Sequence, residues 1–292
     1  MSHVGDDVVL FPERLKASWT TMGPNRKLSL CIAGATGWTG RALVRAVLDA
    51  SDLALVSAVS RSASGQDLGE ALGGGALGVP VHGTVDEALD DTDVLIDYTS
   101  ATAVKANTLA AIAAGVAVVV GSSGLTATDF AEIDSAARER SVGVVASGNF
   151  SLTAAVCQAA ALLAARHLPQ WEVIDYASAT KQDVPSGTAR ELAERLGEIR
   201  RPEVGRPIED LHGPQEARGA TVGGAQVHSV RLPSFVVSTE VVFALPDERL
   251  TIRHDAGGTP DPYVEGTLLA VRKVPELVGL TRGLDNLLLA AN

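Results

Sequence analysis

Three evenly spaced glycines follow an apolar run near the start of the chain. Gly34, Gly37 and Gly40 lie between the apolar residues 28–33 and the helix-forming residues 41–48. Glycine allows a tight strand-to-helix turn and lets backbone N–H groups approach a diphosphate, which a helix N-terminus also attracts. This context predicts a dinucleotide site and not an ordinary tight loop. The expected contacts come from Gly34, Thr36, Gly37, Trp38, Thr39 and Gly40.

The end of the next apolar run should meet the adenosine ribose of that dinucleotide. It carries Ser60 and Arg61, where an NAD site usually places Asp or Glu to bind the 2′-hydroxyl. An arginine beside hydroxyl groups suits a 2′-phosphate instead. NADPH is therefore the preferred cofactor and NADH the alternative, unless Arg61 is simply a solvated loop residue.

Two further apolar runs end in polar turns, at residues 97–100 and 121–124. In open α/β sheets the ligand lies at the carboxyl ends of the strands, so these turns should face the same crevice. We expect contacts to the nicotinamide or its ribose, although either segment could be only a polar turn. The candidates are Tyr98, Thr99, Gly121, Ser122 and Ser123.

A second cluster of chemical groups lies near the middle of the chain. Ser186, Gly187 and Thr188 begin a helix, so their hydroxyls and free N–H groups suit a carboxylate, and Lys181 adds positive charge. The alternative is a plain serine cap beside a surface lysine. The same segment holds three further candidates: Thr180 for substrate binding, and Asp175 and Tyr176 for catalysis, unless they are structural.

The elements that must position these groups follow an α/β pattern. Five runs are apolar throughout, as expected of strands buried on both faces of a parallel sheet, at 28–33, 53–59, 94–98, 116–120 and 142–146. Helices are expected between them at 40–50, 101–114 and 127–138. After Asn149 the pattern changes to helix 152–167, strand 172–176, helix 188–196, a loop at 202–224 and three successive antiparallel strands at 226–231, 236–245 and 249–255. Two final helices are expected at 263–271 and 284–291.

Composition excludes several classes of function. The length of 292 residues favours two domains, and a net charge of −11 argues against binding to nucleic acid. No apolar run is long enough for a membrane helix, so no membrane partner is expected. Two cysteines indicate neither a disulfide framework nor a cysteine-rich metal site, and they favour the cytoplasm. No cluster of His, Cys and carboxylate residues has the spacing of metal ligands, so no metal is expected.

Taken together, these segments resemble the dihydrodipicolinate (4-hydroxy-tetrahydrodipicolinate) reductase family, NAD(P)H enzymes of bacterial lysine synthesis. The likeness spans nearly the whole chain, and the string Lys-x-Asp-x-Pro-Ser-Gly-Thr-Ala at 181–189 is specific to that family. It also includes the glycine turn, Ile96-Asp97-Tyr98-Thr99, Gly121-Ser122-Ser123-Gly124, Gly148-Asn149-Phe150-Ser151 and the closing helix at 263–270.

The resemblance implies an α/β fold in two domains. A Rossmann-type doubly wound parallel sheet would comprise residues 28–150 and 257–292, interrupted by an α+β substrate and oligomerisation domain at 151–256. An extension at 1–27 would precede them. The resemblance also implies a homotetramer, a nicotinamide pocket lined by residues 121–123 and by Ser147 to Phe150 (Asn149 and Phe150 included), and a substrate carboxylate held by Ser186, Gly187 and Thr188.

The chain departs from the family pattern at two places. A pair of histidines, one taken as the proton donor, precedes the lysine in the family, but Ala177 and Ser178 occupy these positions here. Neither residue can act as a general acid, an effect worth about 10²- to 10⁴-fold in rate. Residues 257–262 also replace the family's arginine before the closing helix. Lys181 is therefore the main remaining candidate for donating a proton or polarising the substrate.

These features favour an NAD(P)H-dependent reductase that transfers hydride to a C=N or conjugated imine substrate, an imine-reductase-like activity. The alternatives are 4-hydroxy-tetrahydrodipicolinate reductase itself with another proton donor, a non-catalytic NADP-binding paralogue, and another Rossmann dehydrogenase, which the 181–189 string disfavours. His228 and His254 lie on expected strands and are interpreted as structural residues.

Overall fold

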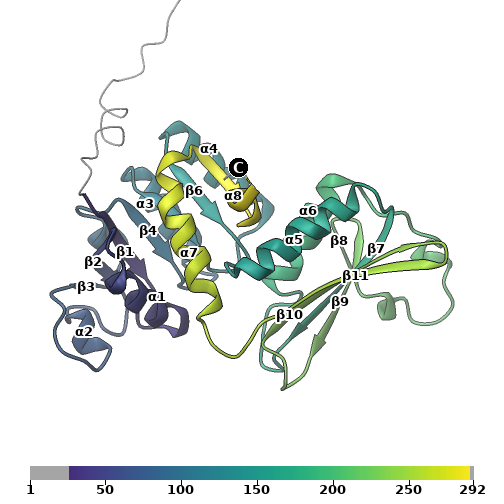
Figure 1. Ribbon diagram of the computed structural model, residues 1–292, viewed down its shortest axis with the longest axis horizontal. Coiled ribbons are helices and arrows are strands. Elements are labelled where there is room, and N and C mark those ends of the chain that lie inside the picture. The colour runs from purple at the N-terminus through teal and green to yellow at the C-terminus, as the bar shows by residue number, and fades with distance from the viewer. Residues whose placement is uncertain (1–25, 290–292) are drawn as a thin grey trace, which may run out of the picture.

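The computed structural model describes residues 26–289, so the predicted extension at 1–27 lies almost wholly outside the described residues. These residues form a seven-stranded and a five-stranded sheet, each with its own helices (Figure 1). The predicted α/β fold, a Rossmann-type parallel sheet with a second α+β domain, is confirmed. The exact domain boundaries stay a prediction.

The first sheet has the order β12-β6-β5-β4-β1-β2-β3, and all its neighbouring strands are parallel. The chain first extends the sheet from β1 toward β3 and then returns to build β4 to β6 on the other side. The order therefore reverses between β1 and β4, which is where such sheets bind a dinucleotide. The strands are β1 Leu28–Ala33, β2 Leu53–Val59, β3 Val81–His82, β4 Val94–Asp97, β5 Ala117–Val120, β6 Gly143–Ala146 and β12 Gly279–Arg282.

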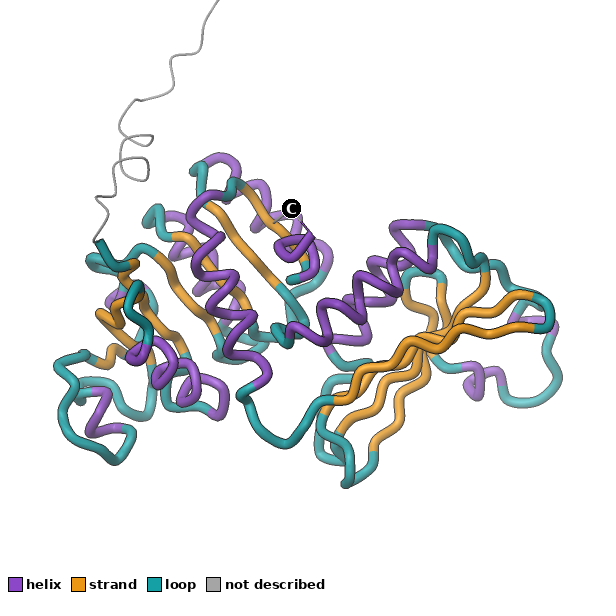
Figure 2. The backbone as a smooth tube through the Cα atoms, in the orientation of Figure 1, coloured by secondary structure: helices purple, strands orange, loops and turns teal. Residues whose placement is uncertain are grey.

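Helices cover both faces of this sheet (Figure 2). On one face pack α1 (Trp38–Asp49) and α7 (Pro262–Lys273), which bury Leu43 and Val271 against the strands. On the other face pack α3 (Val104–Ala113) and α4 (Ala127–Glu139). Apolar strand residues therefore meet a helix layer on both sides, which explains why the runs lack alternation. The short helices α2 (Leu68–Ala71) and α8 (Asp285–Leu289) complete the domain.

The second sheet has the order β11-β10-β7-β9-β8, with α5 (Leu152–Ala165) and α6 (Gly187–Ile199) packed on one face. The predicted β10–β11 antiparallel pair is confirmed. The prediction of three successive antiparallel strands is wrong for β9, which pairs in parallel with β7 because α6 forms the crossover between them. The strands are β7 Gln170–Ala177, β8 Ala220–Val222, β9 Ala225–Arg231, β10 Val237–Leu245 and β11 Glu248–Asp255. The predicted loop at 202–224 missed β8.

The chain returns to the first sheet through β12, which pairs in parallel with β6. This strand was not predicted, because Gly-Leu-Thr-Arg is short and mixed in character. A buried ion pair joins the returning segment to the second domain. Nη1 of Arg195, on α6, lies 2.5 Å from Oδ1 of Asp285, on α8, and Nη2 lies 2.7 Å from Oδ2. The first turn of α8 is thereby tied to α6, the helix that begins at the predicted substrate residues.

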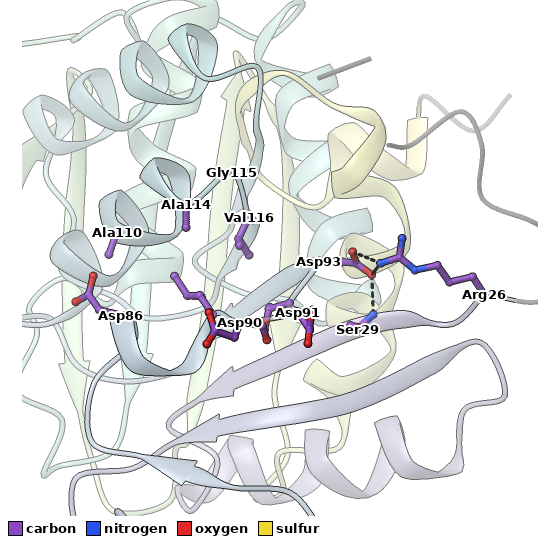
Figure 3. Close-up of a pocket in the computed structure, with 12 residues that line it drawn as sticks. Arg26, Ser29, Asp86, Asp90, Asp91, Asp93, Ala110, Ala114, Gly115 and Val116 are labelled. Atoms are coloured by element: carbon purple, nitrogen blue, oxygen red, sulfur yellow. Dashed lines mark hydrogen bonds and ion pairs between the residues drawn. The ribbon is translucent and has the colours of Figure 1, made fainter. Parts of the chain in front are cut away.

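A cavity of about 640 Å³ opens at the amino ends of the first sheet's strands (Figure 3). Its wall carries Asp86, Asp90, Asp91 and Asp93, and Asp93 pairs with Arg26 at 2.8 Å. Dinucleotides bind such sheets at the carboxyl ends of the strands, and carboxylates repel phosphate. This cavity is therefore not the predicted cofactor site. No helix within residues 26–289 is long and apolar enough to cross a membrane.

Candidate active site

The predicted glycine turn joins β1 to α1 in a conformation that needs glycine. Gly34 has φ of +84°, and its N–H donates to the carbonyl of Val59 at 2.9 Å. A Cβ on Gly40 would lie only 2.1 Å from the carbonyl oxygen of Gly34. Gly37 caps α1 without any side-chain hydrogen bond, so the first-turn N–H groups, which have no acceptor within the helix, are available to a phosphate. The turn therefore fits a dinucleotide diphosphate.

The predicted adenosine end lies beside this turn. Oγ1 of Thr36 lies 2.8 Å from Oγ of Ser60, and Arg61 follows as an exposed side chain. Arg41 was not predicted as a site residue; its Nε donates to the carbonyl of Thr36 at 2.9 Å. Its only signal was its position directly after the third glycine. The two hydroxyls and the Arg41 guanidinium therefore lie at the predicted adenosine end.

Asp97 joins the polar turns that follow β4 and β5. This carboxylate is fully buried; Oδ1 accepts hydrogen bonds from the Thr99 hydroxyl and the Ser122 hydroxyl, both at 2.7 Å. Its other oxygen, Oδ2, accepts one from Asn107 at 2.7 Å. Thr99 and Ser122, predicted as cofactor contacts, are therefore held by Asp97 and shape the crevice. Asn107 lies within an expected helix and gave no signal in the sequence.

Tyr98 forms part of the crevice wall. Its hydroxyl lies 2.8 Å from Oγ1 of Thr267 on α7, and burial raises the pKa of its phenol. A Cβ on Gly121 would lie 2.2 Å from the Tyr98 ring, so only glycine fits there. The two predicted residues therefore pack against each other, and Tyr98 stays protonated as a wall residue.

A cavity of about 220 Å³ between the two domains brings half of the predicted site residues together. From the first domain it is lined by residues of the glycine turn, of the strand ends and of the 147–150 loop. From the second domain it is lined by Lys181 and the first turn of α6. The predicted residues that line it are Trp38, Thr39, Tyr98, Gly121, Ser123, Asn149, Phe150, Lys181, Ser186, Gly187 and Thr188.

Lys181 faces this cavity as half of an ion pair. Its Nζ lies 2.8 Å from Oδ1 of Asp183, whose Oδ2 accepts the Gly187 N–H at 3.2 Å. Burial alone would raise the pKa of the Asp183 carboxyl, but its hydrogen bonds, chiefly with Lys181, outweigh burial and lower it. Ser186 caps α6 by accepting the Ala189 N–H at 3.3 Å. The carboxylate of Asp183 therefore orients both the lysine and the helix start.

The structure places the remaining predicted residues of this segment outside the cavity lining. Asp175 is fully buried beneath it and accepts hydrogen bonds from the Ser186 N–H at 2.9 Å and from Arg231 at 2.8 Å. Tyr176 points to the opposite face of the sheet, because side chains alternate along β7, and its hydroxyl donates to Glu240 at 3.3 Å. Thr180 is exposed. Asp175 thus supports the site, while Tyr176 lies apart from it.

A contact between α6 and the 147–150 loop was not predicted from the sequence. The Gly148 N–H donates to Oε2 of Glu191, and the Thr188 hydroxyl donates to the Gly148 carbonyl at 3.0 Å. Glu191 is buried, and burial raises the pKa of its carboxyl. The available signal was a glutamate on the helix face that otherwise carries Ala189 and Leu192. Both backbone polar groups of Gly148, in the first domain, are therefore hydrogen-bonded to side chains of the second domain.

Comparison with known proteins agrees with this geometry. The family model described as dihydrodipicolinate reductase, N-terminus, matches residues 28–150, and that described as dihydrodipicolinate reductase, C-terminus, matches residues 148–288. The chain belongs to the dihydrodipicolinate reductase family. It is therefore an NAD(P)H-dependent oxidoreductase, as predicted. No group of three or more His, Cys, Asp or Glu side chains in the described part of the chain is arranged to hold a metal.

Individual members of the family cover nearly the whole chain. A 4-hydroxy-tetrahydrodipicolinate reductase of Desulfitobacterium hafniense is 37% identical over 266 residues, 90% of this chain and 99% of the relative. Another, from Synechococcus elongatus, is 38% identical over 273 residues, 89% and 98% of the two chains. A solved dihydrodipicolinate reductase from Paenisporosarcina sp. TG-14, with dipicolinate bound, superposes with a TM-score of 0.70 at 27% identity, over 89% of this chain and 99% of that one.

Proposed function

We propose that this reductase transfers hydride from NADPH to a C=N or conjugated imine substrate that carries a carboxylate. The observation that carries the proposal is the cavity between the domains, which places Lys181 and Thr188 opposite Trp38 and Asn149. A cationic and hydroxyl-rich wall therefore faces the wall expected to hold the nicotinamide. Such an arrangement aligns donor and acceptor and excludes water when the domains close.

The residues present fit a dinucleotide. The first turn of α1 would hold the diphosphate, Ser60 and Arg61 the 2′-phosphate, and residues 121–123 with Asn149 the nicotinamide end. When bound, the dinucleotide supplies the hydride. The absence of a carboxylate after β2 and the presence of Arg41 and Arg61 favour NADPH over NADH.

On the substrate side, the first turn of α6 binds the carboxylate. The Thr188 N–H is the donor at this helix start, since the neighbouring Ser186, Gly187 and Ala189 N–H groups already have side-chain acceptors, and the Lys181 ammonium supplies charge. The ammonium also lowers the energy of negative charge that develops on the substrate as hydride arrives. Asp183 holds the lysine in place through the 2.8 Å ion pair.

The second candidate is the reaction in the relatives' name, 4-hydroxy-tetrahydrodipicolinate reduction in lysine biosynthesis. The intact carboxylate site at 186–188 and the 37% identity favour it. Against it stands the replacement of the family's histidine pair by Ala177 and Ser178. The retained glycine turn and carboxylate site disfavour a non-catalytic paralogue.

The test follows the absorbance of the reduced nicotinamide with a panel of cyclic imines, with and without a carboxylate, and with the lysine-pathway intermediate. We expect turnover of carboxylated imines with NADPH, and a loss of about 10²-fold or more in Lys181→Ala. Gln182→Ala, which changes the exposed neighbour, is the matched control. Turnover of the lysine-pathway intermediate alone would refute the imine reductase and support the second candidate.

We further propose that the protein is a cytoplasmic homotetramer. A groove of about 660 Å³ on the sheet face away from α5 and α6, lined by Ile174, Leu211 and Val242, offers the surface for a second copy. Both cysteines are free, which fits a reducing compartment. Light scattering should give four chains per particle, and Val242→Asp should lower that number. A monomeric wild-type protein would contradict the assembly.

A further inference from the structure

A small polar chamber lies behind the substrate cavity, between α5, α6 and the β10–β11 pair. It is lined by Asn149, Ala154, Cys157, Gln158, Thr188, Glu191, Leu192, Thr239 and His254. Thr239 and His254 are opposite one another in the β10–β11 register, so both side chains reach the chamber from the sheet. Nε2 of His254 lies 3.1 Å from Oγ1 of Thr153 on α5.

Two polar atoms in this chamber have no hydrogen-bond partner among residues 26–289. They are Oγ1 of Thr239, a side chain only 2% exposed, and Nδ1 of His254. A buried polar group without a partner costs about 1–3 kcal/mol, so both atoms indicate a polar ligand between them. The chamber volume is about 20 Å³, and about 10–15 Å³ is enough for one water molecule. The ligand must therefore be the size of a single water.

The chamber adjoins the substrate cavity. Thr188 and Asn149 line both the chamber and the cleft. At these two positions, therefore, only one side chain separates the two spaces. The Thr188 hydroxyl donates to the Gly148 carbonyl at 3.0 Å. A hydroxyl also accepts hydrogen bonds and rotates about its C–O bond, so it can accept from the chamber and donate into the cleft without moving its oxygen.

We propose that this chamber holds one water molecule and that His254, this water and the Thr188 hydroxyl form a relay that delivers a proton to the substrate. The inference rests on the proposed function, because it supplies the acid for that reaction. Neither Ala177 nor Ser178 can do so, and the described structure holds Tyr176 on the far face of the sheet.

The relay supplies the proton that the reduction of the C=N bond consumes. When a C=N bond is reduced, hydride forms a C–H bond at carbon while the π pair moves to nitrogen. Nitrogen then takes a proton from the Thr188 hydroxyl, which regains one from the water, and the water regains one from Nδ1 of the His254 imidazolium, which becomes neutral. The imine is reduced, the nicotinamide is oxidised, and the proton finally comes from solvent at the half-buried histidine.

The test combines a structure with kinetics. A high-resolution crystal structure of the wild-type protein should show a water within about 3.2 Å of both Thr239 Oγ1 and His254 Nδ1. Thr239→Val removes the hydroxyl at constant shape, and His254→Gln removes the ring. Both should lower kcat, by about 10²-fold for His254→Gln, with each KM within about twofold, and both should increase the solvent deuterium isotope effect on kcat.

The matched control is His167→Gln, because His167 is an exposed side chain just after α5 and does not line the chamber. It should keep kcat and the isotope effect of the wild type. An empty chamber, or variants that lose melting temperature while the isotope effect stays unchanged, would overturn the relay. If the wild type reduces imines and the variants keep kcat, only the relay fails; if the wild type reduces none, the proposed function fails, whatever the chamber holds.

Discussion

The ion pair between Arg195 and Asp285 should be one of the strongest single contributors to the junction of the two domains. Both side chains are buried, with exposed fractions of 8% and 1%, and two contacts of 2.5 and 2.7 Å join them. Arg195→Met leaves the Asp285 carboxylate buried and without its partner. Removing one member of a buried pair costs about 3–5 kcal/mol, most of it the cost of the remaining charge. At a dependence of about 3 kcal/mol per molar urea, the unfolding midpoint should fall by about 1–2 M.

The assay is urea unfolding followed by circular dichroism. Arg195→Met with Asp285→Leu removes both charges and should recover most of the loss, since a buried pair is often replaceable by apolar groups. The control is the exposed pair of Arg272 with Asp52, at 2.7 Å with exposed fractions of 40% and 50%. Arg272→Met should cost about 0–1 kcal/mol. A single variant that loses no more than this control, or a double variant no more stable than Arg195→Met, would refute the reasoning.

Three further predictions concern the two sites. Arg61→Glu should weaken NADPH binding about 10- to 100-fold in a fluorescence titration and leave NADH binding unchanged. The reason is that the variant removes charge-assisted hydrogen bonds to the 2′-phosphate, a group that NADH lacks. Gly40→Ala should abolish binding of both dinucleotides, since its Cβ would lie 2.1 Å from the Gly34 carbonyl oxygen, whereas Gly75→Ala, with no atom within 4 Å, should not. Glu191→Gln should raise the melting temperature at neutral pH. Burial raises the pKa of the Glu191 carboxyl above its unfolded value of 4.5, so the folded wild-type protein is most stable when this group is protonated. That stability is fully present below pH 4.5 and is lost as the pH rises through the folded pKa. The gain in melting temperature from Glu191→Gln should therefore vanish below pH 4.5.

The first sheet could be predicted because its strands and helices differ in local pattern. Runs such as residues 28–33 are apolar throughout, and the structure buries them between two helix layers. β12 could not be found in this way, since Gly-Leu-Thr-Arg has no apolar run and becomes a strand only by pairing with β6. The parallel position of β9 also depends on a contact between distant segments, which local periodicity does not encode.

The predicted site residues fall into two groups: those that belong to a local motif and those chosen only because they lie near one in the sequence. The glycine turn and the start of α6 are local motifs, and the structure brings Trp38, Lys181 and Thr188 to one cavity. Asp175 and Tyr176 were chosen for nearness in sequence alone. Because side chains alternate along a strand, Asp175 lies beneath the site and Tyr176 lies on the opposite face of the sheet. His254 and Thr239 meet only through cross-strand pairing, so their chamber has no sequence signal.

Two hydrogen bonds to the backbone of Gly148 link the two halves of the proposed site. Its N–H is held by Glu191 and its carbonyl by Thr188, and both residues belong to the first two turns of α6. Gly148 lies in the loop expected to meet the nicotinamide, whereas Thr188 is expected to meet the substrate. The Thr188 hydroxyl has one hydrogen to donate, so a substrate nitrogen that takes it releases the Gly148 carbonyl. We therefore expect substrate binding to change a hydrogen bond in the proposed cofactor pocket, and a change at either Glu191 or Thr188 should alter affinity for both ligands.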